Sequence, residues 1–323
     1  MAKKRDKASD DNGAQVSMFD SILDRPVETL LPSAREAADS RYPSLLTVVP
    51  LFGANDRENY TTDQKNGQVY EVPGGGIIRR IGEGLDMYDE DTLIAILQLG
   101  AKSKLVGAGS GMPVPLDSEK PGEKTVTVYK GELTAMEINA FLGRGEGGRD
   151  VQLTRDSIRR LANQRLWFES VAGDDDSPME GVTDFFKYKG FSNLRGKLYI
   201  QISPDMVNLL SSYVLMDVAI RKDLSDIGKA LYRYLLTQPR DVRIDLETLA
   251  EGIGFGGIAK ELKRNLLGRP AKGKDNGRTN QLEKLIELGV LVSAEITGTG
   301  RRKPFTLEAV KVHDGEVRRI EKE

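Results

Sequence analysis

The sequence has no cysteine, and it has one histidine and one tryptophan among 323 residues. Without cysteine the chain cannot form disulfides, thiolate zinc sites or a thiol nucleophile. The lone histidine, His313, leaves no second residue for a Ser/His or His/His constellation. No apolar run approaches the roughly 20 residues that a membrane-spanning helix needs. We therefore expect a cytoplasmic protein that is not an enzyme, has no cofactor and makes no membrane contact.

An excess of charge of one sign is also missing. The chain carries 47 Lys and Arg against 49 Asp and Glu, for a formal net charge of -2. Nucleic-acid-binding domains often carry a basic excess, so this balance counts against such a role. The cations are distributed unevenly, however: Ile258 to Lys303 holds eleven Lys and Arg against five Asp and Glu. A neutral chain with a basic segment therefore leaves DNA binding open.

Composition divides the chain into an arm and two folded units. Residues 1–40 are expected to form a flexible arm, since residues 1–13 are polar and cannot bury an apolar core. No apolar stretch follows the charged start, so it is not expected to be a signal peptide. The two units are predicted to span residues 41–222 and 223–323.

The first unit is expected to alternate helices and strands. Asp89, Glu90 and Asp91 place carboxylates where the positive end of a helix favours them, so a helix is predicted there. We interpret these three as helix-terminal charges and not as acid–base catalysts. The other expected elements are helices at Ala34–Asp39, Thr134–Leu142, Thr154–Val171 and Pro204–Tyr213, and strands at Ile77–Ile81, Thr125–Tyr129, Gly181–Gly190 and Leu198–Ile202.

The helix predicted at Thr154–Val171 has two unlike faces. Ile158, Leu161, Ala162 and Phe168 gather on one side, as in a helix that packs against a core. Arginine and Asn/Gln side chains lie on the other, and these form paired hydrogen bonds with guanine and adenine edges. The predicted DNA-binding residues here are Arg155, Arg159, Arg160, Asn163 and Gln164. Arg165 falls on the apolar side, and an ordinary charged surface helix is the alternative interpretation.

The second unit repeats this order. Helices are expected near Asp226–Thr237, Asp245–Gly252, Gly257–Leu267 and Thr279–Leu288, with strands at Val290–Ile296 and Phe305–Val312. Either of the last two helices could enter a DNA groove, and the basic turn between the strands would contact phosphates. The predicted DNA-binding residues are Lys260, Lys263, Arg264, Arg278, Lys284, Arg301, Arg302 and Lys303.

Helix, turn, basic helix and strand ribbon therefore occur twice, at Tyr88–Ile202 and Leu224–Val312. This order is typical of a winged helix, whose second helix enters the major groove while its ribbon contacts the backbone. The predicted fold class is α+β, with two winged-helix domains in tandem behind a disordered N-terminal arm.

Several segments resemble plasmid replication initiators of the TrfA type, within the wider Rep group. Gln15-Val-Ser-Met-Phe19-Asp is similar to the family's QLSLFD, and Leu85 to Asp91 is similar to its L-x-x-x-D-E-D helix entry. Further similar segments are Ser157–Phe168, Leu224–Tyr232, Leu246–Leu249 and Glu283–Leu291. The resemblance runs from Gln15 to about Val312. The glycine-rich Ser103–Glu123 and the basic Gly268–Arg278 depart from the family pattern as apparent insertions.

The resemblance implies binding to direct repeats (iterons) at a replication origin, opening of the adjacent DNA, and recruitment of host proteins such as the helicase and its loader. It also implies a possible homodimer. Gln15, Ser17, Met18 and Phe19 resemble a sliding-clamp-binding motif, and two apolar anchors in an extended peptide suit a hydrophobic pocket.

Two rival functions stay open at this point. A winged-helix transcriptional repressor would use the same domains and bind a palindromic operator. A nucleotide-dependent enzyme is disfavoured, because the glycines around Gly109 and Gly254 lack the Lys-Ser/Thr of a phosphate-binding loop. Asp174, Asp175 and Asp176 are interpreted as a solvated turn, not a metal site.

Overall fold

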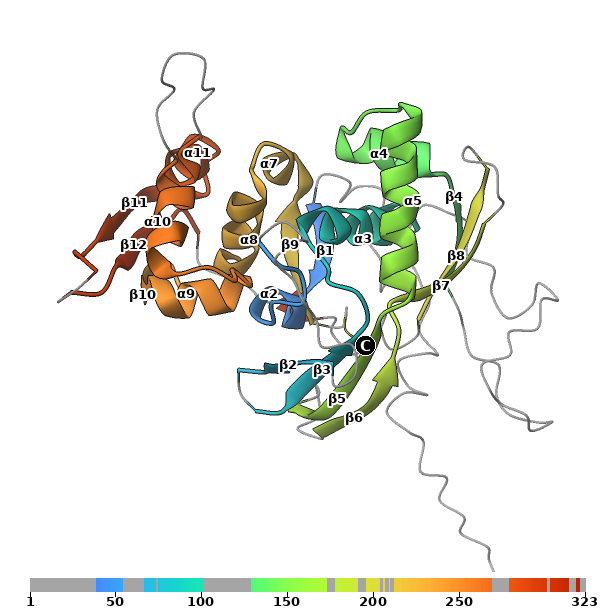
Figure 1. Ribbon diagram of the computed structural model, residues 1–323, viewed down its shortest axis with the longest axis horizontal. Helices are drawn as coiled ribbons and strands as arrows, with labels where there is room; N and C mark the ends of the chain where they lie inside the picture. The colour runs from blue at the N-terminus through green and yellow to red at the C-terminus, as the bar shows by residue number, and fades with distance from the viewer. Residues whose placement is uncertain are drawn as a thin grey trace, which may run out of the picture.

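The computed structural model describes residues 39–54, 67–73, 75–100, 129–172, 178–190, 196–203, 206, 209, 212–268, 279–300, 303–313 and 318–319. Within these ranges the chain is α+β, with helices packed on small antiparallel sheets (Figure 1). The helices are α2 (Leu45–Val48), α3 (Met87–Gly100), α4 (Ala135–Leu142), α5 (Gly148–Ala162), α7 (Val218–Lys222), α8 (Asp226–Leu235), α9 (Leu246–Ile253), α10 (Ala259–Leu267) and α11 (Gln281–Glu287).

The strands belong to four sheets among the described residues. Two have three strands each in matching order: β4 (Tyr129–Leu133), β8 (Leu198–Ile202), β7 (Phe186–Gly190), and β10 (Asp241–Asp245), β12 (Thr306–Lys311), β11 (Leu291–Thr297). The four-stranded sheet is β2 (Gln68–Glu71), β3 (Ile77–Ile81), β5 (Arg165–Ala172) and β6 (Pro178–Thr183). The last is β1 (Asp39–Pro43), β9 (Ser212–Asp217) and β13 (Arg318–Arg319).

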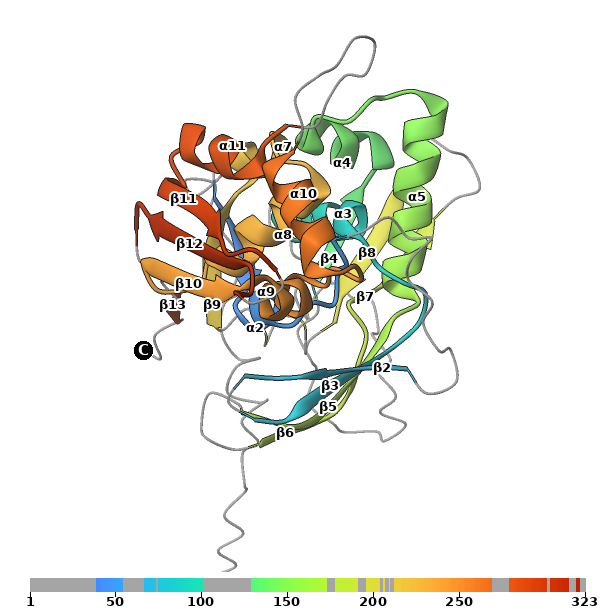
Figure 2. The ribbon, with the colours of Figure 1, turned by 60° about the vertical axis from the view of Figure 1, so that its left-hand side comes forward.

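The two matching sheets belong to two similar successions of elements. In the first, α3, β4, α4 and α5 precede the ribbon β7–β8, and in the second α8, β10, α9, α10 and α11 precede the ribbon β11–β12. In both, the first strand pairs with the last, and the last pairs with the middle one. β5 and β6 stand between α5 and β7 and join the separate four-stranded sheet, which lies below the helices in both ribbon views (Figure 2).

The sheet β1-β9-β13 connects distant parts of the chain. β1 follows the N-terminal segment, β9 precedes α7, and β13 comes from the last residues of the chain. Together with α2 it lies between α8 and α3 (Figure 1). The apolar core is continuous through this region: Leu46 of α2, Ile94 of α3 and Leu231 of α8 all belong to one buried cluster. The two units therefore pack against shared structure.

Several predicted elements are confirmed. α3 begins at Met87, and α4 begins at a capping box, in which Thr134 accepts from the Glu137 N–H and the Glu137 side chain accepts from the Thr134 N–H. Gly143 ends α4 with φ 67°, a left-handed conformation that favours glycine. In the second unit α8, α9, α10, α11, β11 and β12 lie at the predicted positions within a few residues. Polar caps and apolar periodicity located these ends.

The prediction for Thr154–Val171 was wrong in its bounds. α5 begins six residues before the expected start, at Gly148 after the cap residue Gly147, and ends at Ala162. Residues Arg165–Ala172 form β5, because alternating Leu166 and Phe168 fill the buried face of a sheet. Thr154 is therefore not a cap but a buried residue inside α5, and Arg165, expected on the apolar side, is exposed.

Other boundaries also differ. The single strand expected at Gly181–Gly190 is two strands in two sheets, β6 and β7. Of the strand expected at Thr125–Tyr129 only Tyr129 is described, and there β4 begins. Of the helix expected at Ala34–Asp39 only Asp39 is described, and it lies in β1. In Pro204–Tyr213, Met206 and Leu209 are helical, but β9 begins at Ser212.

Candidate nucleic-acid interface

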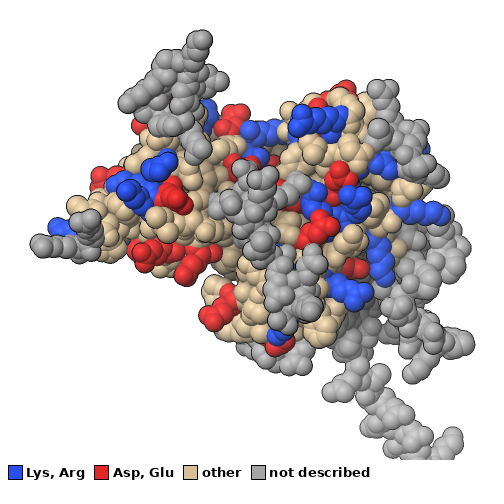
Figure 3. All heavy atoms as spheres, viewed as in Figure 1, with Lys and Arg blue, Asp and Glu red and all other residues tan. Residues whose placement is uncertain are grey.

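The outer face of α5 carries the cations of the first unit. Arg149 and Arg159 are exposed and Arg155 is half-buried, and Arg159 forms an ion pair with Asp156 at 2.9 Å. Lys and Arg side chains lie along this helix in the space-filling view (Figure 3). Asn163, the residue that follows α5, is exposed as well. Of the predicted residues, Arg155, Arg159 and Asn163 thus lie at the surface.

Two other predicted contacts lie in the interior. Arg160 is 7% exposed, and its guanidinium donates to both carboxylate oxygens of Asp89, at 2.6 and 3.2 Å. Gln164 is fully buried: its side-chain amide donates to the Glu83 and Arg160 carbonyls, and its oxygen accepts from Arg80. The helical-wheel prediction placed both outside, because it could not include their partners from distant segments, Asp89 for Arg160 and Arg80 for Gln164. Neither side chain can reach a base, so we correct both predictions.

The ribbon β7–β8 lies next to α5 and adds basic side chains. Lys187 and Lys189 are exposed on β7, and Lys197 is exposed just before β8. Gly190 ends β7 close to α5, because a Cβ there would lie 3.6 Å from the Arg155 guanidinium and only 2.7 Å from the Leu198 side chain. A side chain at residue 190 would therefore require the end of the Leu198 side chain to shift. These lysines were not among the predicted DNA-binding residues, because in this unit all of those were taken from the helix.

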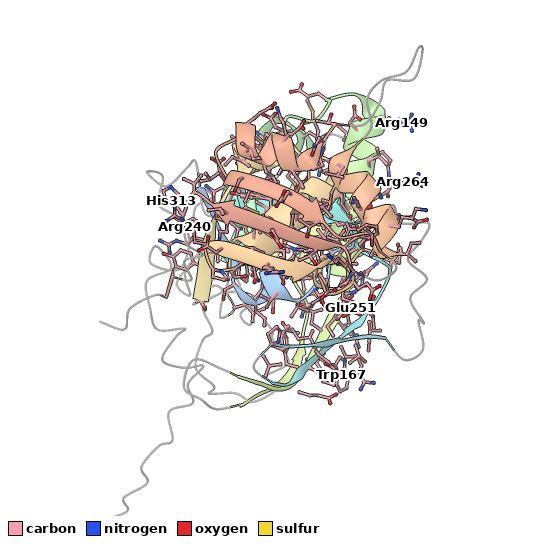
Figure 4. All side chains as sticks on the ribbon, turned by 90° about the vertical axis from the view of Figure 1, so that its left-hand side faces the viewer. Arg149, Trp167, Arg240, Glu251, Arg264 and His313 are labelled. Atoms are coloured by element: carbon pink, nitrogen blue, oxygen red, sulfur yellow. The ribbon has the colours of Figure 1, made fainter. Side chains whose placement is uncertain are left out.

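In the second unit the cations of α10 divide between surface and support. Lys260 and Arg264 are exposed, whereas the Lys263 ammonium lies 4.5 Å from the centre of the Phe305 ring. Leu262 and Leu266 are fully buried and hold α10 on the core. Arg264 of α10 and Arg149 of α5 project from the same side of the molecule, and Arg240 and His313 lie at the opposite side (Figure 4).

The helix α11 offers less to a ligand than expected. The Asn280 side chain caps α11, accepting from the Leu282 and Glu283 N–H groups at 3.0 and 3.3 Å. Lys284 is half-buried and forms an ion pair with Glu287 at 3.4 Å. Of the two helices left open by the sequence, α10 has the more accessible cations. Its first turn borders a hollow of about 480 Å³ whose lining is mixed in charge, with Asp245 and Glu247 facing Lys260.

Most of the remaining predicted residues lie outside the part of the chain that the structure describes. Lys303 is exposed at the end of the β11–β12 turn. The other predicted DNA contacts of this unit and the clamp-motif residues, namely Arg278, Arg301, Arg302, Gln15, Ser17, Met18 and Phe19, lie outside the described residues. The aspartates expected to form a solvated turn, Asp174, Asp175 and Asp176, also lie outside them.

The first turn of α3 holds the most concentrated charge of the interior. Asp89 and Glu90 are fully buried and Asp91 is 6% exposed. Glu90 accepts from Arg221, Arg233 and the Tyr42 hydroxyl, and Asp91 accepts from Arg221 and Lys229. The interpretation of these carboxylates as helix-terminal charges was incomplete, because each one is paired with a cation from another element.

Burial and pairing move the pKa values of these carboxyls in different directions. Burial opposes ionisation of Glu90 and Asp91, but the positive charge of Arg221, helped by Arg233 and Lys229 respectively, holds both pKa values below their ordinary range. For Asp89 burial prevails over the Arg160 pair, and its pKa is raised. The neighbouring cations give Arg221 a raised pKa in turn. Glu90, Asp91 and Arg221 therefore stay charged in the folded protein.

The described residues contain neither a cluster of metal ligands nor a membrane-spanning helix. Among the described residues no group of His, Asp and Glu is arranged to hold a metal ion. No helix in the described ranges is both long and apolar enough to cross a membrane.

Comparison with known proteins finds similar solved structures but no matching family. No family model matches the chain, and no curated protein matches it. Two solved structures of domains 2 and 3 of RctB are similar: one has 14% identity and a TM-score of 0.49 over 84% of this chain and 99% of that one. The other has 15% identity and a TM-score of 0.46 over 83% and 96%. At these values neither likeness establishes a family or a function.

Proposed function

We propose that this protein is a plasmid replication initiator that binds direct repeats at an origin through two winged helices. The observation that carries the proposal is the repeated unit: the two three-stranded sheets share one strand order, and each repeat contains a helix with exposed cations. α5 and α10 take the role of reading helices, and both lie on one side of the molecule (Figure 4). A protein of this shape suits a long site on one duplex.

The residues divide by role. Arg159 and Asn163 on the α5 side, and Arg264 with Lys260 on α10, are proposed to reach base edges, because their side chains are exposed on the reading helices. Lys187, Lys189 and Lys303 lie on or beside the ribbons and are proposed to contact phosphates, which contribute affinity without reading sequence. Arg155, Lys263 and Lys284 support these surfaces.

The replication role depends on the resemblance to TrfA-type initiators. It includes origin opening, recruitment of the helicase and its loader, and clamp binding through Gln15–Phe19. A transcriptional repressor with the same units is the second candidate. The two differ in their DNA, since a repressor dimer requires a palindrome and an initiator requires direct repeats.

The first experiment is a footprint of the purified protein on its own replicon at near-physiological salt. Protection of several direct repeats beside an AT-rich tract is expected. Arg159→Ala should then weaken specific binding by roughly 1–3 kcal/mol with little loss of non-specific binding. Lys284→Ala is the matched control on a half-buried, paired cation. Protection of one palindrome over a promoter would favour the repressor instead.

The arm is tested separately. Phe19→Ala should abolish binding to the sliding clamp and leave origin binding unchanged, because it removes one apolar anchor of the motif and no DNA contact. Titration of the clamp by calorimetry measures the first effect and the footprint measures the second. Unchanged clamp affinity would contradict this part of the proposal.

A further inference from the structure

The first turn of α3 contacts the reading helix α5 at several points. The Tyr88 hydroxyl lies 2.8 Å from Thr154 Oγ1 in the middle of α5, and Asp89 binds Arg160 near its end. Arg144, in the turn before α5, lies with its guanidinium 3.4 Å from the centre of the Tyr88 ring and donates to the Tyr88 carbonyl. The position of α5 is therefore set along its length by one turn of α3.

The same turn holds the second unit from its other side. Lys229 of α8 donates to Asp91 at 2.7 Å, and Arg233 of α8 donates to Glu90 at 3.2 Å. Arg221 of α7 donates to both carboxylates. Arg233 also donates to the Ile253 carbonyl at the end of α9, the helix that precedes α10. A chain of buried, charged contacts thus runs from α5 through α3 to α8 and α9.

Charged side chains are an unusual choice for such a junction. A buried ion pair stabilises a fold no better than well-packed apolar residues of the same size, but it demands a specific geometry. Apolar side chains can slide over one another, whereas each guanidinium and carboxylate here must keep its partner in a low-dielectric interior. This arrangement favours one relative orientation of the two units over nearby alternatives.

We propose that Asp89, Glu90 and Asp91 are positioning residues that fix α5 relative to α10, so that both helices meet one duplex at a set spacing. The inference rests on the proposed function and deepens it by assigning the spacing of the DNA site to these residues. None of the three touches DNA. Their effect is preorganisation, which raises affinity by removing the cost of ordering the two units on binding.

The orientation can be measured without DNA. The chain has no cysteine, so Gln152→Cys on α5 and Glu261→Cys on α10 place two unique spin labels on exposed positions. Pulsed electron resonance should give one narrow distance distribution in the otherwise unchanged protein and a broadened one in Asp91→Asn. Asp226→Asn is the matched control: this carboxylate also pairs with Lys229, at 3.6 Å, but is half exposed and pairs with no other cation among the described residues.

The effect of Asp91→Asn on DNA binding is measured by changing the spacing between the two halves of the site. Inserting two base pairs between the two halves turns one half by about 70° around the helix axis. The unchanged protein should lose about tenfold or more in affinity for the altered site, since its units are held in one orientation. Asp91→Asn should bind the natural site about tenfold more weakly and lose less than about threefold on insertion. A purely structural defect would weaken both sites equally.

The outcomes separate the hypotheses. If Asp91→Asn folds and keeps the narrow distance distribution and the full spacing penalty, the positioning role is overturned. If the unchanged protein binds no repeat DNA while Asp91→Asn broadens the distances, the proposed function fails and the orienting role stands. Should Asp91→Asn not fold, Lys229→Gln removes a single cation from the cluster and replaces it in both measurements, with Lys284→Gln as its control.

Discussion

The helices α5 and α10 occupy equivalent places in the two units, yet they are held differently. Both pack buried apolar residues on the core, such as Ile158 and Leu161 of α5. α5 adds buried polar contacts, with Arg160 paired to Asp89 and Thr154 bonded to Tyr88 and Asn139. α10 is held by the buried Leu262 and Leu266, and none of its cations is buried. An arginine on a basic helix can therefore belong to the ligand-binding face or to the support behind it.

The difference between α5 and α10 separates two roles, ligand binding and structural support, that the sequence pattern does not distinguish. In α5 the neighbours Arg159 and Arg160 point to different environments, one 61% exposed in its side chain and one paired in the interior. In α10 the cations stay near the surface, so each can leave one hydrogen-bonding partner for another without becoming a buried, unpaired charge. We expect α5 to be the rigid reader and α10 the more adaptable one, and three predictions test this contrast.

The largest effect is expected from removing a supporting cation. Arg160→Met should lower the free energy of unfolding by about 3–5 kcal/mol at neutral pH, because Asp89 is then buried without its partner. Lys263→Met on α10 should cost only about 1 kcal/mol, since it removes an ammonium from the face of a partly exposed ring. Denaturant unfolding monitored by circular dichroism measures both.

The Arg160→Met defect should also shrink as the pH is lowered. Asp89 already has a raised pKa, and a proton removes the charge that lacks a partner. Equal losses for Arg160→Met and Lys263→Met would show that α5 and α10 are supported alike.

The second prediction concerns acid. Because the pKa values of Glu90 and Asp91 are lower in the folded protein than their ordinary values of 4.5 and 3.8, their stabilisation is complete above those values and is lost as the pH falls through the folded-state values. Asp89 acts in the opposite sense, since its raised pKa favours the folded state below its ordinary value. Two of these three carboxyls have lowered pKa values and one has a raised value. We therefore expect their summed contribution to the free energy of unfolding to decrease in acid.

Glu90→Gln tests this sign. The variant should be less stable at neutral pH, and its free energy of unfolding should decrease less steeply below about pH 4.5 than that of the unchanged protein. The control is Glu261→Gln, the same substitution at an exposed position of α10. An unchanged slope in Glu90→Gln would mean that the cluster does not govern acid stability.

The smallest effect is expected at the ribbons. Lys187→Ala beside α5 and Lys303→Ala near α10 should each reduce the steepness of the salt dependence of DNA binding by about one counterion and weaken all sequences alike. Fluorescence anisotropy at several salt concentrations measures the slope. A change in sequence preference at either position would instead assign a base contact to the ribbon.

Much of the secondary structure could be predicted from local chemistry. The Thr134 cap with Glu137, the left-handed Gly143 and the carboxylates in the first turn of α3 mark helix ends whose partners lie within four residues. The predicted bounds of α5 were wrong because its ends lack such local signals. Its true start follows Gly147, which makes no side-chain cap, and the alternation of Leu166 and Phe168, which indicates a strand, was interpreted as a continuation of the helix.

The candidate interface was predictable only in part. The exposed positions of Arg159, Asn163, Lys260 and Arg264 agree with the helical wheel, because those residues lie within or just beyond true helices. Arg160 and Gln164 were misplaced, since their partners Asp89 and Arg80 are 71 and 84 residues away in the chain. A local pattern contains no information about such partners.

The sequence by itself determined the helices and the ribbon of the second unit, the absence of thiol chemistry and the positions of the basic segments, because these depend on residue type and local spacing. Only the tertiary structure decided which cations face outward and which carboxylates are buried. Asp89, Glu90 and Asp91 are the clearest case: as letters they are an acidic helix start, and in the fold each finds a cation brought from a distant segment. Long-range packing sets those distances, and the free energy of a buried charge depends on them.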